Sequence, residues 1–376
     1  MRAASDWLHQ RYRDAGSGLC ASVPLRLYSF ARFRIIELPK RYDRTGGVSM
    51  YQAARGCVSA SQTFVFSPSG GNVTGRFAPT PSGRLHLGNL LCALLAYLSA
   101  RHAGGRFLLR IEDLDAPRCP RTLARQAVED LAWFGFRWDE PPLYQSERTA
   151  LYQAHLEQLE ARGLIYPCFC TRAQLQRQAS AAPNLGDTQR IYSGACAHLT
   201  REEATRLSLV RPPALRLRVP DEEIHFVDGV QGPQCENLAR DCGDFIVRRS
   251  DGLFGYQLAV VVDDALTGVD EVVRGRDILS ATPRQIYLLR ELGYPVPRYY
   301  HIPLLTDAQG RRLAKRDRDL DLGELSRRYS PQRLLGMLSY AAGLLEEDRP
   351  ADLEELTALF DWSKVRRDDL RLPSWL

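Results

Sequence analysis

The sequence predicts an α/β protein with a doubly wound, Rossmann-like sheet. The first observation is the order strand, Gly/Pro/Ser-rich loop, helix, strand. An apolar strand over residues 76–79 precedes the loop, an apolar helix runs from Leu90 to Arg101, and a second strand covers Arg106 to Ile111. The second observation is composition, because 376 residues with 44% hydrophobic and 25% charged content are ordinary for a globular protein. Disordered, collagen-like and small disulfide-rich chains are therefore excluded.

The basic excess of the chain lies in its N-terminal fifth. The whole chain has 50 basic and 45 acidic residues, a formal net charge of +5. Residues 1–74 hold 10 basic and 4 acidic residues, which leaves 40 basic and 41 acidic residues in 75–376. A nucleic-acid function therefore has to rest on local motifs and not on net charge.

Residues 1–74 are predicted to be a poorly ordered N-terminal extension, because their periodicity is weak and residues 59–72 are polar and turn-rich. Two interpretations of the Arg-rich part, 26–44, remain open: a transit-like segment or an arm that binds nucleic acid. Translation that begins at Met50 or near Val73 is another alternative. The chain has no apolar run of membrane-spanning length and no secretory h-region, so we expect a cytoplasmic protein.

The loop after the first strand has the composition of a phosphate-binding loop. Gly83 and Gly88 allow close approach of the backbone, and the helix start near Gly88 offers N–H groups and the positive end of the helix dipole. His86 stands at this helix start as a donor for a phosphate. A single histidine in this position more often has a structural role. The surrounding sequence therefore has to decide between a structural and a phosphate-binding role of His86.

The residues around His86 resemble the first signature of class I glutamyl-tRNA synthetases and their relatives. Residues 76–83 read Arg-Phe-Ala-Pro-Thr-Pro-Ser-Gly, and residues 86–88 read His-Leu-Gly. The second signature of that class is a lysine-bearing loop, which residues 312–316 match with Arg-Leu-Ala-Lys-Arg. Lys315 is one of only two lysines beyond residue 74.

The resemblance implies ATP chemistry, in which a carboxylate attacks the α-phosphorus and pyrophosphate leaves without a covalent enzyme intermediate. His86 and Lys315 are the implied catalytic residues, and Mg²⁺ accompanies the ATP. The sequence departs from the signatures at Asn89, usually a second histidine, and at Arg312 and Ala314, usually lysine and serine. The implied ATP site consists of Pro79, Thr80, Pro81, Ser82, Gly83, His86, Gly88, Asn89, Arg312, Leu313, Ala314, Lys315 and Arg316.

Charged residues at other predicted strand ends are candidates for an amino-acid site. Glu112 follows the second strand and can pair with an α-ammonium group, although a solvated acidic turn is the alternative. Arg274 follows Val272-Val273 and suits bidentate recognition of a carboxylate. These segments resemble the glutamyl-Q tRNA(Asp) synthetases, the truncated branch of the family. The implied glutamate site is Arg76, Phe77, Ala78, Pro79, Thr80, Glu112, Tyr256 and Arg274, with a core aromatic as the alternative for Tyr256.

Three cysteines have a spacing that suits a metal ion. Cys168, Cys170 and Cys196 supply three thiolates, which is most of a tetrahedral zinc shell; the alternative is three buried cysteines. The resemblance adds Tyr192 as the fourth ligand, with His198 as the alternative. One structural Zn²⁺ per chain is expected, because no open coordination position is implied. No ligand spacing is found at the other six cysteines, which are Cys20, Cys57, Cys92, Cys119, Cys235 and Cys242.

Local capping signals predict further helices. They cover residues 122–134 with Thr122 as the cap, 147–162 with Ser146 as the cap, Pro331 towards Tyr340 with Ser330 as the cap, and 353–359. The resemblance arranges the chain as a class I synthetase catalytic domain over 75–320, with a zinc-binding, acceptor-type insert at about 141–240, and a helical C-terminal tail over 321–376.

Only 60 residues follow Arg316, too few for the anticodon-binding domain of discriminating glutamyl-tRNA synthetases. The resemblance therefore implies a ligase that activates L-glutamate with ATP, without tRNA, and transfers it to queuosine in the anticodon loop of tRNA(Asp). The alternatives are a truncated enzyme that charges tRNA(Glu), a non-catalytic paralogue that binds tRNA or adenylate, and a small-molecule adenylyltransferase. We expect a monomer that contacts RNA around residues 311–318 and does not need residues 1–74 for glutamate activation.

Overall fold

The computed structural model describes residues 72–171, 173–175, 191–306 and 321–372, all of which belong to the unit Ser59–Leu376. Residues 1–71 of the predicted extension lie outside the described residues. The lysine-bearing loop, 312–316, and the expected RNA contact, 311–318, also lie outside them.

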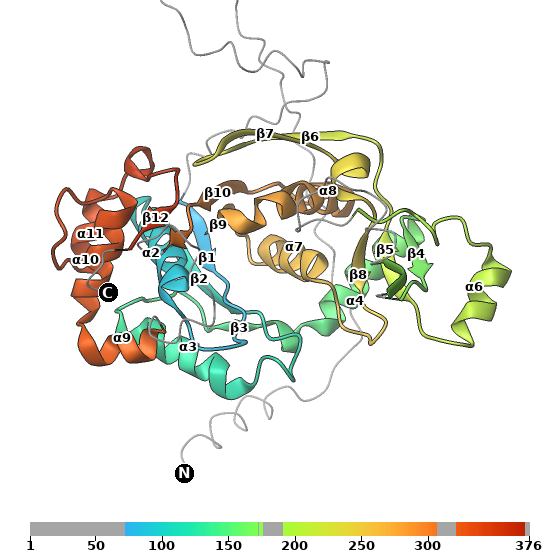
Figure 1. The fold of residues 1–376 in the computed structure, drawn as a ribbon, viewed down its shortest axis with the longest axis horizontal. Helices are drawn as coiled ribbons and strands as arrows, with labels where there is room; N and C mark the ends of the chain where they lie inside the picture. Colours follow the sequence, from blue (N-terminus) through green and yellow to red (C-terminus); the bar gives the residue numbers. More distant parts are fainter. Residues whose placement is uncertain (1–71, 172, 176–190, 307–320, 373–376) are drawn as a thin grey trace, which may run out of the picture. The chain divides into compact units, whose positions relative to one another are not determined.

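A five-stranded parallel sheet forms the centre of the described chain (Figure 1). Its strand order is β10 (Arg298–Ile302), β9 (Glu271–Gly275), β1 (Thr74–Phe77), β2 (Arg106–Ile111) and β3 (Leu143–Tyr144). The chain moves from β1 outwards to β2 and β3, and from β9 outwards to β10 on the other side. The order therefore reverses between β1 and β9, and the adjoining carboxyl ends of the strands are where open α/β sheets bind ligands.

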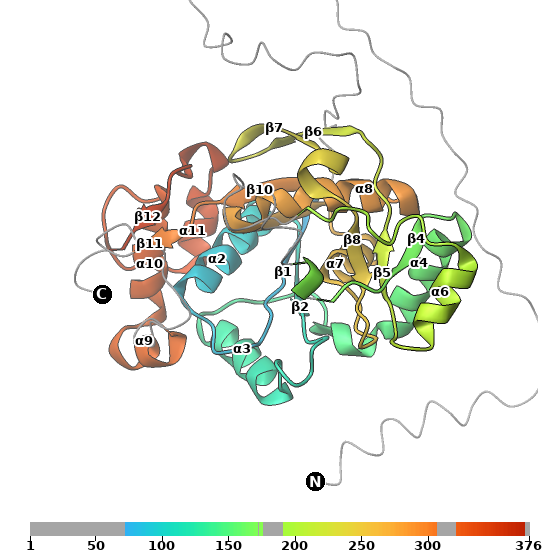
Figure 2. The ribbon, with the colours of Figure 1, turned by 45° about the vertical axis from the view of Figure 1, so that its right-hand side comes forward.

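Helix α2 (Leu87–His102) covers one face of this sheet and packs against β1, β2 and β9. Phe107 and Leu109 of β2 point to this face, whereas Leu108 between them points to the other, as strand alternation requires. The C-terminal helices α10 (Pro331–Ala342) and α11 (Leu353–Leu359) share the apolar core of α2, and Figures 1 and 2 show them beside it.

The opposite face of the sheet is covered by α4 (Thr149–Ala161), α7 (Tyr256–Leu266) and α8 (Thr282–Leu292). The apolar run Leu258 to Val262 is buried, as predicted, and forms part of α7. The helix–sheet–helix layering and the parallel sheet confirm the predicted fold class.

Most of the antiparallel structure lies between β3 and α7 in the sequence. One sheet has the order β4 (Ile165–Cys168), β5 (Ala214–Leu217) and β8 (Phe245–Arg248), with α6 (Arg201–Ser208) leading into β5. A hairpin of β6 (Glu223–Asp228) and β7 (Gly232–Asn237) packs its first strand against β10 and α8, and Figure 1 shows the hairpin along these elements. The hairpin therefore touches the central sheet as well as the sequence-local elements around it.

The remaining elements complete the described chain. They are α3 (Arg121–Trp133), η1 (Gln145–Glu147), the π-helix η2 (Leu238–Cys242), η3 (Arg276–Ala281), β11 (Leu305–Thr306), α9 (Leu322–Arg328), η5 (Trp362–Lys364) and β12 (Leu370–Arg371). Strands β11 and β12 pair in parallel, so the end of the tail returns to the segment that follows β10.

Two predicted helix caps are wrong. Helix α3 begins at Arg121 after Pro120, with no side-chain cap, so Thr122 lies inside it. Helix α4 begins at Thr149, and Ser146 lies in η1, where its hydroxyl donates to Asp113 Oδ2 at 2.8 Å. That contact takes the hydroxyl away from the helix start. Ser330 does cap α10, and α11 has the predicted bounds.

Candidate active site

His86 forms the N-cap of α2 through a reciprocal capping box. Its Nδ1 accepts a hydrogen bond from the Gly88 N–H at 3.1 Å, and Asn89 Oδ1 accepts one from the His86 N–H at 3.1 Å. With Nδ1 as an acceptor, a neutral imidazole carries its proton on Nε2. Asn89 therefore has a structural role here, because it closes the box that orients His86.

The chain that follows the lysine-bearing loop returns to this helix start. The backbone of Asp321 pairs with that of His86, and the Leu322 N–H donates to Leu85 O at 2.8 Å. Asp321 then caps α9, because its Oδ1 accepts hydrogen bonds from the Gly323 N–H at 2.7 Å and the Glu324 N–H at 3.0 Å. Lys315 stands six positions before Asp321 in the sequence and lies outside the described residues.

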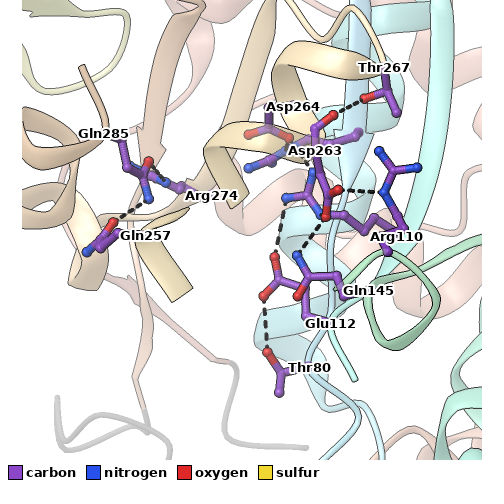
Figure 3. A network of polar contacts seen from close by, with 12 residues as sticks. Thr80, Arg110, Glu112, Gln145, Gln257, Asp263, Asp264, Thr267, Arg274 and Gln285 are labelled. Atoms are coloured by element: carbon purple, nitrogen blue, oxygen red, sulfur yellow. Dashed lines mark hydrogen bonds and ion pairs between the residues drawn. The ribbon is translucent and has the colours of Figure 1, made fainter. Parts of the chain in front are cut away.

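A buried ion-pair network links β1 and β2 to helix α7 (Figure 3). Arg110 on β2 donates hydrogen bonds to Asp264 and, at 3.3 Å, to Glu112 Oε1. Arg76 on β1 donates from Nε to Asp264 Oδ1 at 3.3 Å and from Nη1 to Val273 O at 3.1 Å. Burial raises the pKa of Asp264, but the charges of Arg110 and Arg76 outweigh it and hold that pKa below its usual value. Asp264 is therefore ionised and fixes both arginines.

Glu112 lies at the carboxyl end of β2 and contacts the first-signature loop. Its Oε2 accepts a hydrogen bond from Thr80 Oγ1 at 3.2 Å, and its backbone N–H donates to Pro79 O at 3.0 Å. Burial raises the pKa of Glu112 above its ordinary value, although Arg110 and Arg76 act against this rise. Figure 3 shows Thr80, Glu112 and Arg110 in one continuous chain of contacts.

Tyr256 is the first residue of α7 and stands near the same charges. The residue is 40% exposed, yet the protein around its hydroxyl raises the pKa of that group, and the charge of Glu112 adds to the rise. Arg274, Arg76 and Arg110 lower the same pKa, so all these side chains act on one hydroxyl. The Tyr256 hydroxyl therefore interacts electrostatically with three predicted glutamate-site residues, Arg76, Glu112 and Arg274.

Arg274 lies on β9, is 5% exposed and donates hydrogen bonds from all three of its nitrogens. Nε donates to His301 Nε2 at 2.9 Å. Nη1 donates to Gln285 Oε1 at 2.7 Å, and Nη2 donates to Thr282 Oγ1 at 2.7 Å. Gln285 in turn donates to Gln257 on α7 at 2.9 Å, which Figure 3 shows. The guanidinium therefore has a fixed plane and direction.

The three predicted thiolate ligands come together beside Tyr192. The sulfurs of Cys168, Cys170 and Cys196 lie within 4.8 Å of one another. The Tyr192 hydroxyl is 3.5 Å from Cys168 Sγ and 3.6 Å from Cys170 Sγ. Three thiols and a phenol oxygen fit the four-coordinate shell of a structural zinc ion. His198 is not among the side chains gathered around these sulfurs.

A second group of possible metal ligands lies on the β6–β7 hairpin. Cys235 is paired in register with His225, whose Nε2 is 3.7 Å from the sulfur and 3.2 Å from Glu223 Oε2. The sequence shows no ligand spacing at Cys235, because its possible partners lie on the opposite strand and at the start of β6. A sequence spacing of ten residues does not indicate this proximity.

Comparison with known proteins places the chain in a family. Residues 72–334 match the model "tRNA synthetases class I (E and Q), catalytic domain". The chain is 50% identical over 310 residues to the glutamyl-Q tRNA(Asp) synthetase of Symbiobacterium thermophilum, which covers 80% of this chain and 96% of that protein. The chain belongs to the glutamyl-Q tRNA(Asp) synthetase family. It is therefore a ligase of the class I aminoacyl-tRNA synthetase type, as the two signatures predict.

Other members and solved structures agree with this family. The glutamyl-Q tRNA(Asp) synthetase of Neisseria meningitidis serogroup C is 45% identical over 300 residues, which cover 80% of this chain and 97% of that protein. The crystal structure of glutamate-tRNA synthetase from Elizabethkingia anophelis superposes with a TM-score of 0.72 at 26% identity, covering 81% of this chain and 69% of that one. Among the described residues, no helix is long and apolar enough to cross a membrane.

Sequence reasoning missed several residues of this family member's buried polar network. Asp263 is fully buried and accepts hydrogen bonds from Gln145 at 2.9 Å, Tyr152 at 2.8 Å and Arg148 at 2.6 Å. The available signal was the acidic pair that directly follows five apolar residues of α7. The partners of Arg274 were also missed, although Thr282 and Gln285 are spaced for one face of a helix.

Proposed function

We propose that the protein activates L-glutamate with ATP, without tRNA, and transfers the glutamyl group to queuosine in the anticodon loop of tRNA(Asp). The observation that carries this proposal is the place of two charged residues next to the reversal of strand order: Glu112 follows β2, and Arg274 lies near the end of β9. Both act electrostatically on the Tyr256 hydroxyl. The helix start that His86 caps belongs to the same loop region. The identity to glutamyl-Q tRNA(Asp) synthetases supports the same substrates.

Glutamate has two carboxylates and one ammonium group, and the residues here offer matching charges. Glu112 pairs with the α-ammonium group, since it is acidic and lies at the end of β2. Arg274 binds a carboxylate through the N–H groups that its three protein contacts leave over. The Tyr256 hydroxyl interacts electrostatically with both of these residues. Residues 76–80 shape the remaining wall of the glutamate site.

Activation joins the α-carboxylate of glutamate to the α-phosphorus of ATP, and pyrophosphate leaves. His86 donates from Nε2 to a phosphate oxygen, and the first N–H groups of α2 add positive potential there. Lys315 supplies a point charge to the phosphates from the other side. Mg²⁺, bound with the ATP, neutralises charge on the phosphate oxygens. The other residues of the predicted ATP site, 79–83, 88, 89, 312–314 and 316, position the nucleotide.

Transfer consumes the glutamyl-adenylate. A hydroxyl of the queuosine cyclopentenediol attacks the activated carbonyl carbon, the bond from that carbon to the phosphate oxygen breaks, and AMP leaves. The product is an ester on the modified base. Residues 311–318, which are rich in arginine, supply a local basic contact for the RNA.

A structural Zn²⁺ is held by Cys168, Cys170, Tyr192 and Cys196. The support is the donor set, because three sulfurs and one phenol oxygen lie within contact distance of one another. The ion ties β4 to the segment at 192–196 and has no part in the reaction. Residues 75–320 form the catalytic domain with its insert at about 141–240, and 321–376 form the tail.

The deciding experiment is transfer of labelled glutamate to tRNA(Asp) with and without queuosine, beside glutamate-dependent ATP–pyrophosphate exchange in the absence of tRNA. We expect exchange without tRNA and label only on the queuosine-containing tRNA(Asp). Label on unmodified tRNA(Asp) or on tRNA(Glu) contradicts the proposed acceptor. Absence of exchange at saturating glutamate contradicts the activation step.

A further inference from the structure

Arg274 differs from the other buried arginines of the site in the charge of its partners. Arg110 and Arg76 are both paired with the carboxylate of Asp264. The three nitrogens of Arg274 donate instead to an imidazole nitrogen, an amide oxygen and a hydroxyl oxygen. No carboxylate of the described residues lies within ion-pair distance of Arg274. Its positive charge is therefore oriented by the protein but not neutralised by a direct partner.

His301 holds the Nε side of this guanidinium. It lies on β10, directly beside Arg274 in the parallel register of β9 and β10, and is 0% exposed. Because Nε2 accepts from Arg274, the proton of a neutral ring must be on Nδ1, and Nδ1 is 2.5 Å from Asp228 Oδ2. The three side chains therefore form a directed chain of hydrogen bonds from Arg274 to a buried carboxylate.

Asp228 ends strand β6 and anchors this chain to the hairpin. Its Oδ1 accepts hydrogen bonds from the Val230 N–H at 3.0 Å and the Gln231 N–H at 2.9 Å, and the His301 N–H reaches the same carboxylate at 3.1 Å. Gln231 also donates from its side chain to His301 O at 2.8 Å. The turn of the β6–β7 hairpin thus holds both the backbone and the ring of His301.

We propose that His301 and Asp228 are positioning residues for glutamate binding: they orient Arg274 through a neutral imidazole, so that the positive charge of Arg274 is left for a carboxylate of the substrate. This inference rests on the proposed function of Arg274 in the glutamate site. A carboxylate in the place of His301 would compete with the substrate for the guanidinium. The imidazole supplies direction without that competition, and Asp228 fixes the tautomer of the ring.

The protonation of the ring agrees with this arrangement. Burial lowers the pKa of His301 to about 4; the charges of Arg274 and Arg76 act in the same direction, and Asp228 acts against them. The ring of Tyr299, whose centroid is 6.0 Å away, stacks on the imidazole and adds no charge at neutral pH. His301 is therefore neutral near pH 7, where its Nε2 can accept from Arg274.

The first test compares His301→Leu with His301→Gln in glutamate-dependent ATP–pyrophosphate exchange. Leucine removes the acceptor, whereas a glutamine amide can accept from Arg274 and donate to Asp228. We expect His301→Leu to raise the KM for glutamate roughly 10- to 100-fold and to leave the KM for ATP within about twofold. His301→Gln should recover most of the glutamate KM. His102→Leu, at the far end of α2, is the matched control, and thermal unfolding verifies the fold of every variant.

The second test reads the ring directly and needs no activity. In the ¹⁵N-histidine NMR spectrum of the full chain at pH 7, we expect His301 to show a protonated Nδ1 and an unprotonated Nε2. The opposite tautomer or an imidazolium ring overturns the proposal, as does a folded His301→Leu variant with an unchanged glutamate KM. A wild-type protein without any exchange contradicts the proposed function instead, and the tautomer then still decides the geometry of the hydrogen-bond chain.

Discussion

The backbone of Asp321 pairs with that of His86, so the segment after the lysine-bearing loop lies beside the first signature. The pairing is reinforced by the hydrogen bond from the Leu322 N–H to Leu85 O. A chain of six residues spans at most about 20 Å, which limits how far Lys315 can lie from Asp321. The pairing therefore brings the segment from Asp321 onwards, six positions after Lys315 in the sequence, to the helix start that His86 caps.

Lys315→Ala is expected to lower the rate of glutamate-dependent ATP–pyrophosphate exchange by about 100-fold, because it removes a charge from the phosphates in the transition state. Glutamate binding, measured by calorimetry, should change little. Lys364→Ala is the matched control, since Lys364 is the other lysine beyond residue 74 and lies in η5 of the tail. Exchange at the wild-type rate in Lys315→Ala would remove this lysine from the site.

The cysteine cluster predicts a loss of zinc on substitution of a single ligand. Cys168→Ser should lower the zinc content, measured by mass spectrometry of the purified protein, and lower the melting temperature, because a structural ion contributes to folding. Tyr192→Phe should reduce zinc affinity, whereas His198→Ala should not, since only Tyr192 lies beside the sulfurs. Full zinc content in Cys168→Ser shows that the ligand set is wrong.

Cys235→Ser is the control for this experiment, because Cys235 belongs to the separate group on the β6–β7 hairpin. Its zinc content should equal that of the wild type. A fall in zinc in Cys235→Ser, with full zinc in Cys168→Ser, would move the metal site to the hairpin.

Two truncations that end just before and just after the start of β1 are expected to differ in their effect on the protein. Removing residues 1–71 should leave glutamate-dependent exchange unchanged, because Val73 and Thr74 keep their contacts. The Val73 O accepts from the Arg106 N–H at 2.7 Å, and the Thr74 N–H donates to Asp270 Oδ1 at 2.9 Å. Removing residues 1–74 deletes both hydrogen bonds and the buried Val73 side chain.

The longer truncation is therefore expected to cost about 2–4 kcal/mol of stability, which urea unfolding can measure. The expectation that glutamate activation does not need residues 1–74 stays a prediction, whereas for stability these contacts place the boundary before Val73. Equal stability of the two truncated proteins would contradict the structural role of these two residues.

The βαβ unit that carries the first signature could be predicted because its signals are local. Apolar runs, a glycine-rich loop and the two glycines after the helix all lie within neighbouring residues. The role of His301 could not be predicted in this way, since it depends on the parallel register of β9 and β10, which nothing in the sequence specifies. The contact of Cys235 with His225 likewise depends on a hairpin register. Ser146 is a different case: the local sequence predicts a helix cap, but the hydroxyl forms a tertiary hydrogen bond with Asp113 instead.

The buried imidazole of His301 predicts a pH dependence of stability with a defined sign. The pKa of His301 is about 4 in the folded protein and about 6.5 when the side chain is exposed. Between these values the unfolded chain binds more protons than the folded one, so the free energy of unfolding rises with pH. The contribution of His301 is fully present above pH 6.5 and is lost as the pH falls towards 4. Its total is on the order of 3 kcal/mol.

Comparison with His301→Gln isolates this effect from the other titrating groups. Burial raises the pKa of Asp228, but its hydrogen bonds with His301 outweigh this and keep the pKa below the usual value of an aspartate. The stability that Asp228 contributes is therefore present above that usual value and is lost only as the pH falls below it. The difference in free energy of unfolding between the two proteins should therefore fall as the pH is lowered from 6.5 to 4.5 in urea titrations. If the difference in free energy of unfolding stays constant over this range, His301 has an ordinary pKa in the folded protein. A neutral imidazole would then not connect Asp228 with Arg274 over this pH range.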